Sequence, residues 1–214
     1  MKPSFAILIA LFAASTSEAA LLNRWSFNQT AAAAPSGTVF TDSVSGMAMT
    51  VRGNGAVLDG SRITLPGNTT SGTAEPGIAA YLNLPNGIIS SKTNLTVEIW
   101  AAPLSAQFFQ PLFDFGRMNH AGDGAGAAGE WTGTTGAVPP TSETSDGIAL
   151  LINRSTDLST QRQGSRINGG TPLYLDSNLP TTAGTTYHYA LTFQDTVSGG
   201  TVSWYRNGVL VTSG

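Results

Sequence analysis

Acidic side chains that could form the carboxylate pair of a glycoside hydrolase do not occur at paired positions in this sequence. A retaining enzyme needs two carboxylates about 5–5.5 Å apart, which on a β-strand requires acids at alternate positions. Glu98 has Thr96 and Trp100 as its neighbours on the same side of a predicted strand. Asp114 has no acidic neighbour either. We interpret Glu98 as a structural residue that anchors a loop or a neighbouring strand, and we predict no catalytic residues.

Other kinds of catalytic chemistry also lack their motifs. The chain has 2 His and 0 Cys, which excludes thiol catalysis, disulfides and cysteine-ligated metals. No Gly-x-Ser-x-Gly elbow leads from a strand to a helix, and no Gly-rich phosphate loop opens a helix. His188 is predicted to face outward from a strand, in a solvated or cross-strand role.

Sugar binding needs an exposed aromatic side chain beside amides or acids, because a pyranose has an apolar face and a polar rim. Trp25 and Trp204 lie on apolar strand faces and are predicted to be core residues. Trp100 is opposite the apolar face of its strand. We expect it either in the groove of a sandwich or beneath a covering loop.

The best surface tryptophan is Trp131, which stands in a stretch without strand pattern from residue 117 to residue 146. The predicted ligand-binding residues are therefore Trp131, Glu130, Arg117, His120 and Asp123. Loops of roughly thirty residues are usually either functional or disordered. The Gly/Ala-rich composition of this one favours disorder.

Strands must position nearly all of these residues, because apolar and polar residues alternate with period two along most of the chain. The predicted strands cover residues 21–27, 47–51, 63–65, 82–84, 95–101, 111–116, 147–153, 173–176, 187–194, 202–204 and 209–211. The last two flank Asn207-Gly208, a dipeptide typical of a type I′ hairpin turn. Since every strand has one apolar face to cover, we predict an all-β fold, an antiparallel two-sheet jelly-roll β-sandwich, with Val97 and Leu191 facing inward.

The N-terminus has the pattern of a secretion signal. Lys2 precedes the apolar stretch 5–14, and Ser17-Glu18-Ala19 fits a cleavage site. The alternative, an anchor helix, needs roughly 20 apolar residues. We predict a signal peptide at 1–19, a single domain at 20–214, and a secreted, extracellular or cell-surface location.

Composition narrows the partners. Charged residues make up 11% of the chain, and its 10 Lys and Arg form no cluster, so a nucleic-acid partner is not expected. After the N-terminal apolar stretch the sequence has no long apolar run, so we predict no membrane span. A chain of this size can bury a core without disulfides, which agrees with the absence of cysteine in an exported protein.

Six segments, taken in order, resemble the laminin-G-like domains of the concanavalin A-like lectin/glucanase (jelly-roll) superfamily found in exported bacterial proteins. They are Leu22-Asn23-Arg24-Trp25-Ser26-Phe27, Asp42-Ser43-Val44-Ser45-Gly46, Val57-Leu58-Asp59-Gly60 before Ile63-Thr64-Leu65-Pro66, Leu95-Thr96-Val97-Glu98-Ile99-Trp100, Tyr187-His188-Tyr189-Ala190-Leu191-Thr192-Phe193, and Gly200-Thr201-Val202-Ser203-Trp204-Tyr205-Arg206-Asn207-Gly208. The resemblance covers residues 22–211. It implies two curved sheets, usually used as a binding or adhesion module and often with calcium near one edge. It implies a fold more firmly than a ligand.

By family position, Asn28 and Asp42 are the implied metal ligands, for a structural calcium ion that needs six to eight oxygen ligands. Two departures qualify this. Met47 follows Gly46 where the family usually has Asn, and Asp42 could instead cap its own turn. Family members also continue into a further strand beside the first one, so either this sequence is a fragment without its last strand or its first strand keeps an unpaired edge.

The sequence therefore predicts a secreted, non-catalytic module that binds a carbohydrate or cell-surface polymer. Two alternatives stay open. One is a structural or adhesive surface domain without sugar specificity. The other is a glycoside hydrolase on the same fold.

Overall fold

The computed structural model describes residues 19–66, 80–85, 87–89, 92–105, 110–116, 147–153, 160–166, 173–196 and 199–214, and these residues contain strands and no helix. In chain order the strands are β1 (Ala32–Ala33), β2 (Val39–Thr41), β3 (Ala48–Arg52), β4 (Val57–Leu58), β5 (Ile63–Thr64), β6 (Tyr81–Asn83), β7 (Asn94–Ala101), β8 (Gln110–Gly116), β9 (Gly147–Asn153), β10 (Gln161–Arg166), β11 (Leu173–Ser177), β12 (Tyr187–Thr196), β13 (Gly199–Arg206) and β14 (Val209–Ser213). Every pair of neighbouring strands is antiparallel. The prediction of an all-β antiparallel fold is confirmed.

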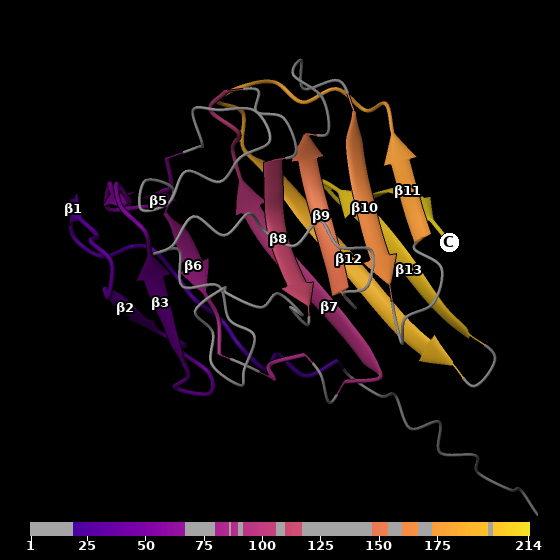
Figure 1. Ribbon diagram of the computed structural model, residues 1–214, viewed down its shortest axis with the longest axis horizontal. Helices are drawn as coiled ribbons and strands as arrows, with labels where there is room; N and C mark the ends of the chain where they lie inside the picture. Colours follow the sequence, from indigo (N-terminus) through magenta and orange to yellow (C-terminus); the bar gives the residue numbers. More distant parts are fainter. Residues whose placement is uncertain are drawn as a thin grey trace, which may run out of the picture.

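Two four-stranded sheets form the larger part of the molecule. The front sheet has the order β11-β10-β9-β8 and the back sheet has the order β14-β13-β12-β7. Figure 1 shows the front sheet lying over β7, β12 and β13 of the back sheet. Their inner faces share one hydrophobic cluster, which joins Ile148 and Leu150 of β9 to Leu191 of β12 and Trp204 of β13. The two sheets therefore form a β-sandwich.

Period-two alternation explains the back sheet. In β7 the burial alternates along the whole strand, and Leu95 and Ile99 pack against the shared core. In β12, Tyr189 and Leu191 are buried on the inner face. The predicted inward faces of both strands are thus confirmed, since Leu191 has no exposed surface and Val97 is half-buried.

The hairpin between β13 and β14 follows from its turn residues. Asn207 has φ 52° and Gly208 has φ 78°, and positive φ at both central positions defines the predicted type I′ turn. Asn207 also binds back to β12. Its N–H donates to the carbonyl of His188 (2.8 Å), and its Oδ1 accepts from the N–H of His188 (2.9 Å). The turn thereby fixes the backbone of His188.

The strand β10 was not predicted, because its inner face is polar. Gln161–Arg166 contains no aliphatic or aromatic side chain, yet it pairs with both β9 and β11. Gln161 and Gln163 point inward and have no exposed surface. The amide of Gln161 donates a hydrogen bond to the hydroxyl of Thr181, in the connection between β11 and β12. Because polar glutamines occupy the inward positions of β10, its sequence lacks the alternation of apolar and polar residues by which strands are predicted.

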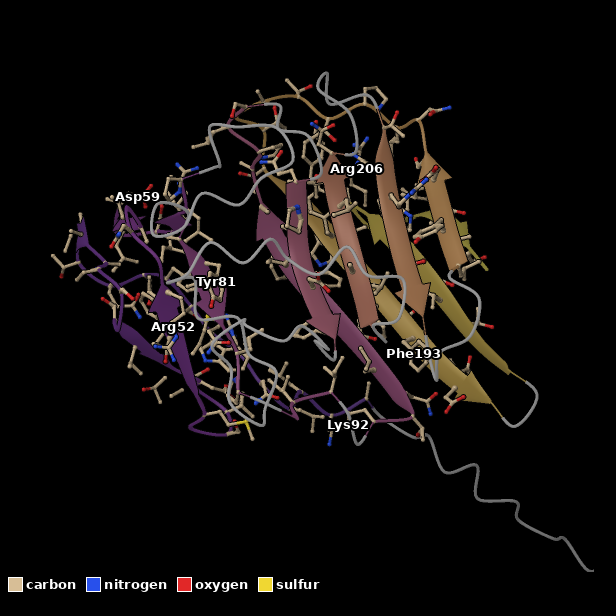
Figure 2. The ribbon with its side chains drawn as sticks, in the orientation of Figure 1. Arg52, Asp59, Tyr81, Lys92, Phe193 and Arg206 are labelled. Atoms are coloured by element: carbon tan, nitrogen blue, oxygen red, sulfur yellow. The ribbon has the colours of Figure 1, made fainter. Side chains whose placement is uncertain are left out.

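The N-terminal region forms two small sheets, β2-β3-β6 and β1-β4-β5, beside the sandwich (Figure 1). Its strands have two to five residues, and it has its own hydrophobic cluster, which includes Phe40, Met49, Val51 and Leu58. Figure 2 shows Arg52 and Tyr81, which are register partners on β3 and β6, in this region. No strand of these sheets pairs with a described strand of the sandwich.

The predicted strand at 21–27 is extended but forms no ladder with any described strand. The backbone of Arg24 instead binds the turn at 42–47, where its carbonyl accepts from the N–H of Ser43 (2.9 Å). Trp25 and Phe27 pack against the N-terminal cluster, but Trp25 is only half-buried, so its predicted core position is met in part. Leu21 alternates with period two onto the same side as Trp25 and Phe27, but it is 63% exposed, and Met47 at the start of the next predicted strand is 44% exposed.

The predicted signal peptide lies outside the described residues except for Ala19. No described residue belongs to a helix that is long and apolar enough to cross a membrane.

Candidate functional site

The predicted ligand-binding loop lies outside the described residues. This applies to Trp131, Glu130, Arg117, His120 and Asp123, so their role stays a prediction. The candidate sites among the described residues lie at Asp42 and at Trp100.

The predicted metal ligand Asp42 is itself buried, at the start of an exposed turn, and accepts hydrogen bonds at both carboxylate oxygens. Oδ1 accepts from the N–H of Arg24 (2.6 Å) and of Val44 (2.8 Å). Oδ2 accepts from Nδ2 of Asn23 (2.6 Å), from the N–H of Ser45 (3.1 Å) and from the hydroxyl of Ser45. Asp42 therefore caps its own turn and ties it to the extended segment at 21–27. The capping alternative is confirmed.

This bonding stabilises the ionised form of Asp42. Burial is the largest single influence and raises the pKa of the carboxyl, but the hydrogen bonds from Ser45, Arg24, Val44 and Asn23 together outweigh it. The pKa of Asp42 is consequently well below its usual range.

Calcium at Asn28 and Asp42 stays a prediction. Asn28 is exposed. Within the described ranges, no three His, Asp or Glu side chains gather in a group that could hold a metal ion. Calcium sites also recruit carbonyl, amide and water oxygens, so a chelation experiment is the appropriate test.

The most prominent exposed aromatic side chain of the described chain is Trp100, which is 66% exposed on the outer face of the back sheet. We expect it in a groove or beneath a loop, and among the described residues no loop covers it. Its neighbours along β7 on the core side, Ile99 and Ala101, pack inward. The outward direction of Trp100 thus follows from strand alternation. A large exposed aromatic group of this kind often marks an interaction site.

Trp100 is held in place by His188. The two residues are direct register partners on β7 and β12, and their rings stack with centroids 4.4 Å apart and planes at 29°. The Asn207 turn fixes the backbone of His188, so the ring beneath Trp100 is anchored by the C-terminal hairpin. The predicted cross-strand role of His188 is confirmed. One face of the indole is covered by imidazole.

Glu98 adds a carboxylate beside this stack. Its Oε2 lies 3.5 Å from Nε2 of His188, and about half of the Glu98 side chain is exposed. Glu98 thus lies beside the neighbouring strand β12, but Nε2 of His188 has no hydrogen-bond partner among the described residues, so the structural role of Glu98 stays a prediction. The same carboxylate can still accept hydrogen bonds from a bound molecule, because each oxygen has more than one acceptor position.

The residues in register with Glu98 continue this outer surface across all four strands of the back sheet. The register runs from Glu98 to Ala190, Tyr205 and Leu210, on β7, β12, β13 and β14. Tyr205 is half-buried and Leu210 is 51% exposed. Ala190, between Glu98 and Tyr205 in this row, has a small side chain that projects little from the sheet. We call Glu98, Trp100, His188, Tyr205 and Leu210 the back-sheet platform.

The sequence held a signal for this platform that was not used for site prediction. Trp100 stands on the side of its strand otherwise occupied by Thr96 and Glu98. A tryptophan on the polar side of an alternating strand is exposed unless another element packs on that side. The sequence alone does not show whether such an element is present.

Comparisons with known proteins add no relative. No family model, no curated protein and no solved structure matches this chain. The class of the protein is therefore defined by its fold, an all-β antiparallel sandwich, and the laminin-G-like resemblance and jelly-roll topology stay predictions.

Proposed function

We propose that this chain is an exported, non-catalytic binding module whose back-sheet platform binds a glycan or another cell-surface polymer. The observation that carries the proposal is the exposure of Trp100, stacked on His188 beside Glu98. An indole face binds the apolar face of a pyranose, and a neighbouring carboxylate accepts hydrogen bonds from sugar hydroxyls. The platform spans the four strands of the back sheet, which is the extent that binding of an extended polymer requires.

The placement of the acidic residues that the structure describes supports a non-catalytic role. Glu98 has Ala190 and then Tyr205 as partners in its row, neither of which is an acid. On the outer face of the front sheet, Asp114 and Asp176 lie on the two edge strands, β8 and β11. Three strand spacings separate their backbones by roughly 14 Å, whereas glycosidase carboxyl pairs are about 5–9.5 Å apart.

Asp114 is the described acid that comes closest to a general acid. Desolvation raises the pKa of its carboxyl, although the residue as a whole is exposed. A raised pKa is a property of general acids, but such an acid also needs a partner carboxylate, and the geometry above offers it none among the described residues.

Affinity electrophoresis tests the proposal. The wild-type protein is run in gels containing a mixed-linkage β-glucan, xyloglucan, galactomannan or an α-glucan, beside Trp100→Ala and the control Val39→Ala, which removes an exposed apolar side chain of β2. We expect retardation of the wild type and the control, and about tenfold weaker binding of Trp100→Ala, since aromatic anchors dominate binding energy. Equal retardation of Trp100→Ala and wild type in every gel contradicts the platform.

Further arms separate the alternatives. Loss of binding in Trp131→Ala alone would move the site to the predicted loop, and loss with a chelator would support calcium. Retention on whole cell envelopes that Trp100→Ala leaves unchanged would favour a structural role. Release of reducing sugar that Asp114→Asn abolishes would show a hydrolase.

A further inference from the structure

A second aromatic side chain is exposed on the opposite side of the molecule. Tyr174 of β11 is 56% exposed and faces outward from the front sheet. Its register partner on β10 is Gly164, followed by Ala149 on β9 and Asp114 on β8. The two residues between Tyr174 and Asp114 in this row, a glycine and an alanine, have no long side chain.

Tyr174 is fixed and flanked by polar groups. The guanidinium carbon of Arg162 lies 4.5 Å from the centre of the Tyr174 ring. Arg162 also forms a bidentate ion pair with its register partner Asp176, with Nε to Oδ1 at 2.6 Å and Nη2 to Oδ2 at 2.8 Å. The guanidinium is therefore held over one face of the tyrosine ring while paired with a carboxylate.

The charge of this cluster indicates the kind of ligand. The Arg162–Asp176 pair has no net charge, so it offers little attraction to a polyanion or a polycation. The pair occupies two of the five N–H donors of the guanidinium. An aromatic ring beside arginine donors and carboxylate acceptors matches a neutral polyol, whose vicinal hydroxyls both donate and accept.

We propose that the outer face of the front sheet is a second glycan-binding site, centred on Tyr174, Arg162 and Asp176, so that one domain bridges two chains of a neutral polysaccharide. This inference rests on the proposed function for its first site. The two sheets lie about 10 Å apart in a sandwich, and their outer faces point in opposite directions. One straight polymer segment cannot contact both faces, whereas two segments can.

Bridging is measured with the neutral polysaccharide that retards the wild-type protein most. Retardation in the gel reports binding, and the rise in viscosity of the polysaccharide solution reports cross-linking. The variants are Trp100→Ala, Tyr174→Ala, the double variant, Tyr174→Phe and the control Val39→Ala. Circular dichroism verifies folding, and sedimentation verifies that the protein is a monomer.

We expect each single alanine variant to keep binding through its remaining site but to lose cross-linking, and the double variant to lose both. Tyr174→Phe should keep at least half of the wild-type viscosity effect, because the ring is retained. Cross-linking by Tyr174→Ala at the wild-type level overturns the second site. Binding that Tyr174→Ala abolishes and Trp100→Ala does not would refute the back-sheet platform while supporting the Tyr174 site. Cross-linking confined to a sedimenting dimer would refute bridging by one domain.

Discussion

The sandwich and the N-terminal region both bury an apolar cluster between β-strands, but they differ in strand length and in the size of the buried side chains. The sandwich has strands of up to ten residues, long ladders, and large buried side chains such as Trp204 and Leu150. The N-terminal region has strands of two to five residues, and its buried residues include alanines, such as Ala34 and Ala56. Long strands hold their register through repeated backbone bonds, whereas short ones need help from turns.

Aspartate side chains give that help in the N-terminal region. Asp42 binds the turn at 42–47 to the extended segment at 21–27. Asp59 caps the turn between β4 and β5, accepting from the N–H of Ser61 (2.9 Å) and pairing with Arg62 (2.7 Å). We therefore predict that apolar burial alone stabilises the sandwich, whereas the N-terminal region depends on its apolar cluster together with ionised carboxylates.

The largest expected loss of stability comes from the sandwich core. Trp204 has no exposed surface and packs in the cluster that joins both sheets. Trp204→Ala should lower the free energy of unfolding by about 3–5 kcal/mol, as measured by urea denaturation. A loss below about 1 kcal/mol would mean that the sheets do not depend on this shared core.

The second effect tests the carboxylates. The pKa of Asp42 is lowered in the folded protein, so its contribution to stability is complete above the unfolded pKa of about 3.8 and declines as the pH falls below it toward the folded pKa. Asp42→Ala should destabilise the N-terminal region at neutral pH and flatten the acid dependence of its unfolding.

Hydrogen exchange at pH 7 and pH 3 measures this effect region by region. Asp195→Ala, which alters an exposed aspartate in β12, is the control. Equal loss of protection in β12 and β3 on Asp42→Ala would show that the two regions unfold as one unit, and an unchanged acid dependence would contradict the role of the carboxylate.

Both regions contain strands that the sequence predicted correctly and segments that it did not. The strands β7 and β12 were predicted with their correct faces, because apolar residues alternate with polar ones throughout both. The strand β10 was missed because Gln161 and Gln163 point inward. The extended segment at 21–27 was predicted as a strand because its pattern is right, but its backbone binds a side-chain-capped turn rather than a strand.

The candidate site shows a similar limit. The sequence pattern placed Trp100 on the outer side of its strand, but it did not show that the side chain is 66% exposed, since exposure depends on which distant segments cover the sheet. The stack with His188 depends on a strand register between segments almost ninety positions apart, at 100 and 188. Pair contacts of this kind are not encoded in local periodicity.

A third prediction concerns the polar part of the sandwich core. Gln163 is fully buried, and its side-chain oxygen and nitrogen have no hydrogen-bond partner among the described residues. Buried amides without partners cost about 1–3 kcal/mol. Gln163→Met, which keeps the volume, should therefore raise the free energy of unfolding by roughly 1 kcal/mol in urea denaturation. A clear loss would show that the amide makes an essential polar contact.

The smallest expected effects form a matched pair, one in each region. Gly46 has φ 75° in the Asp42 turn and Gly208 has φ 78° in the β13–β14 hairpin, and a Cβ at either position would meet no atom within 4 Å. Gly46→Ala and Gly208→Ala therefore introduce the same backbone strain, about 1 kcal/mol each, without a steric clash. If the chain unfolds in one cooperative step, both variants lower its melting temperature equally. If the N-terminal region opens separately, Gly46→Ala lowers hydrogen-exchange protection in β2 and β3 only, and Gly208→Ala lowers it in the back sheet. Because the local strain is matched, any difference between the two variants reports how strongly each region is coupled to the rest of the fold.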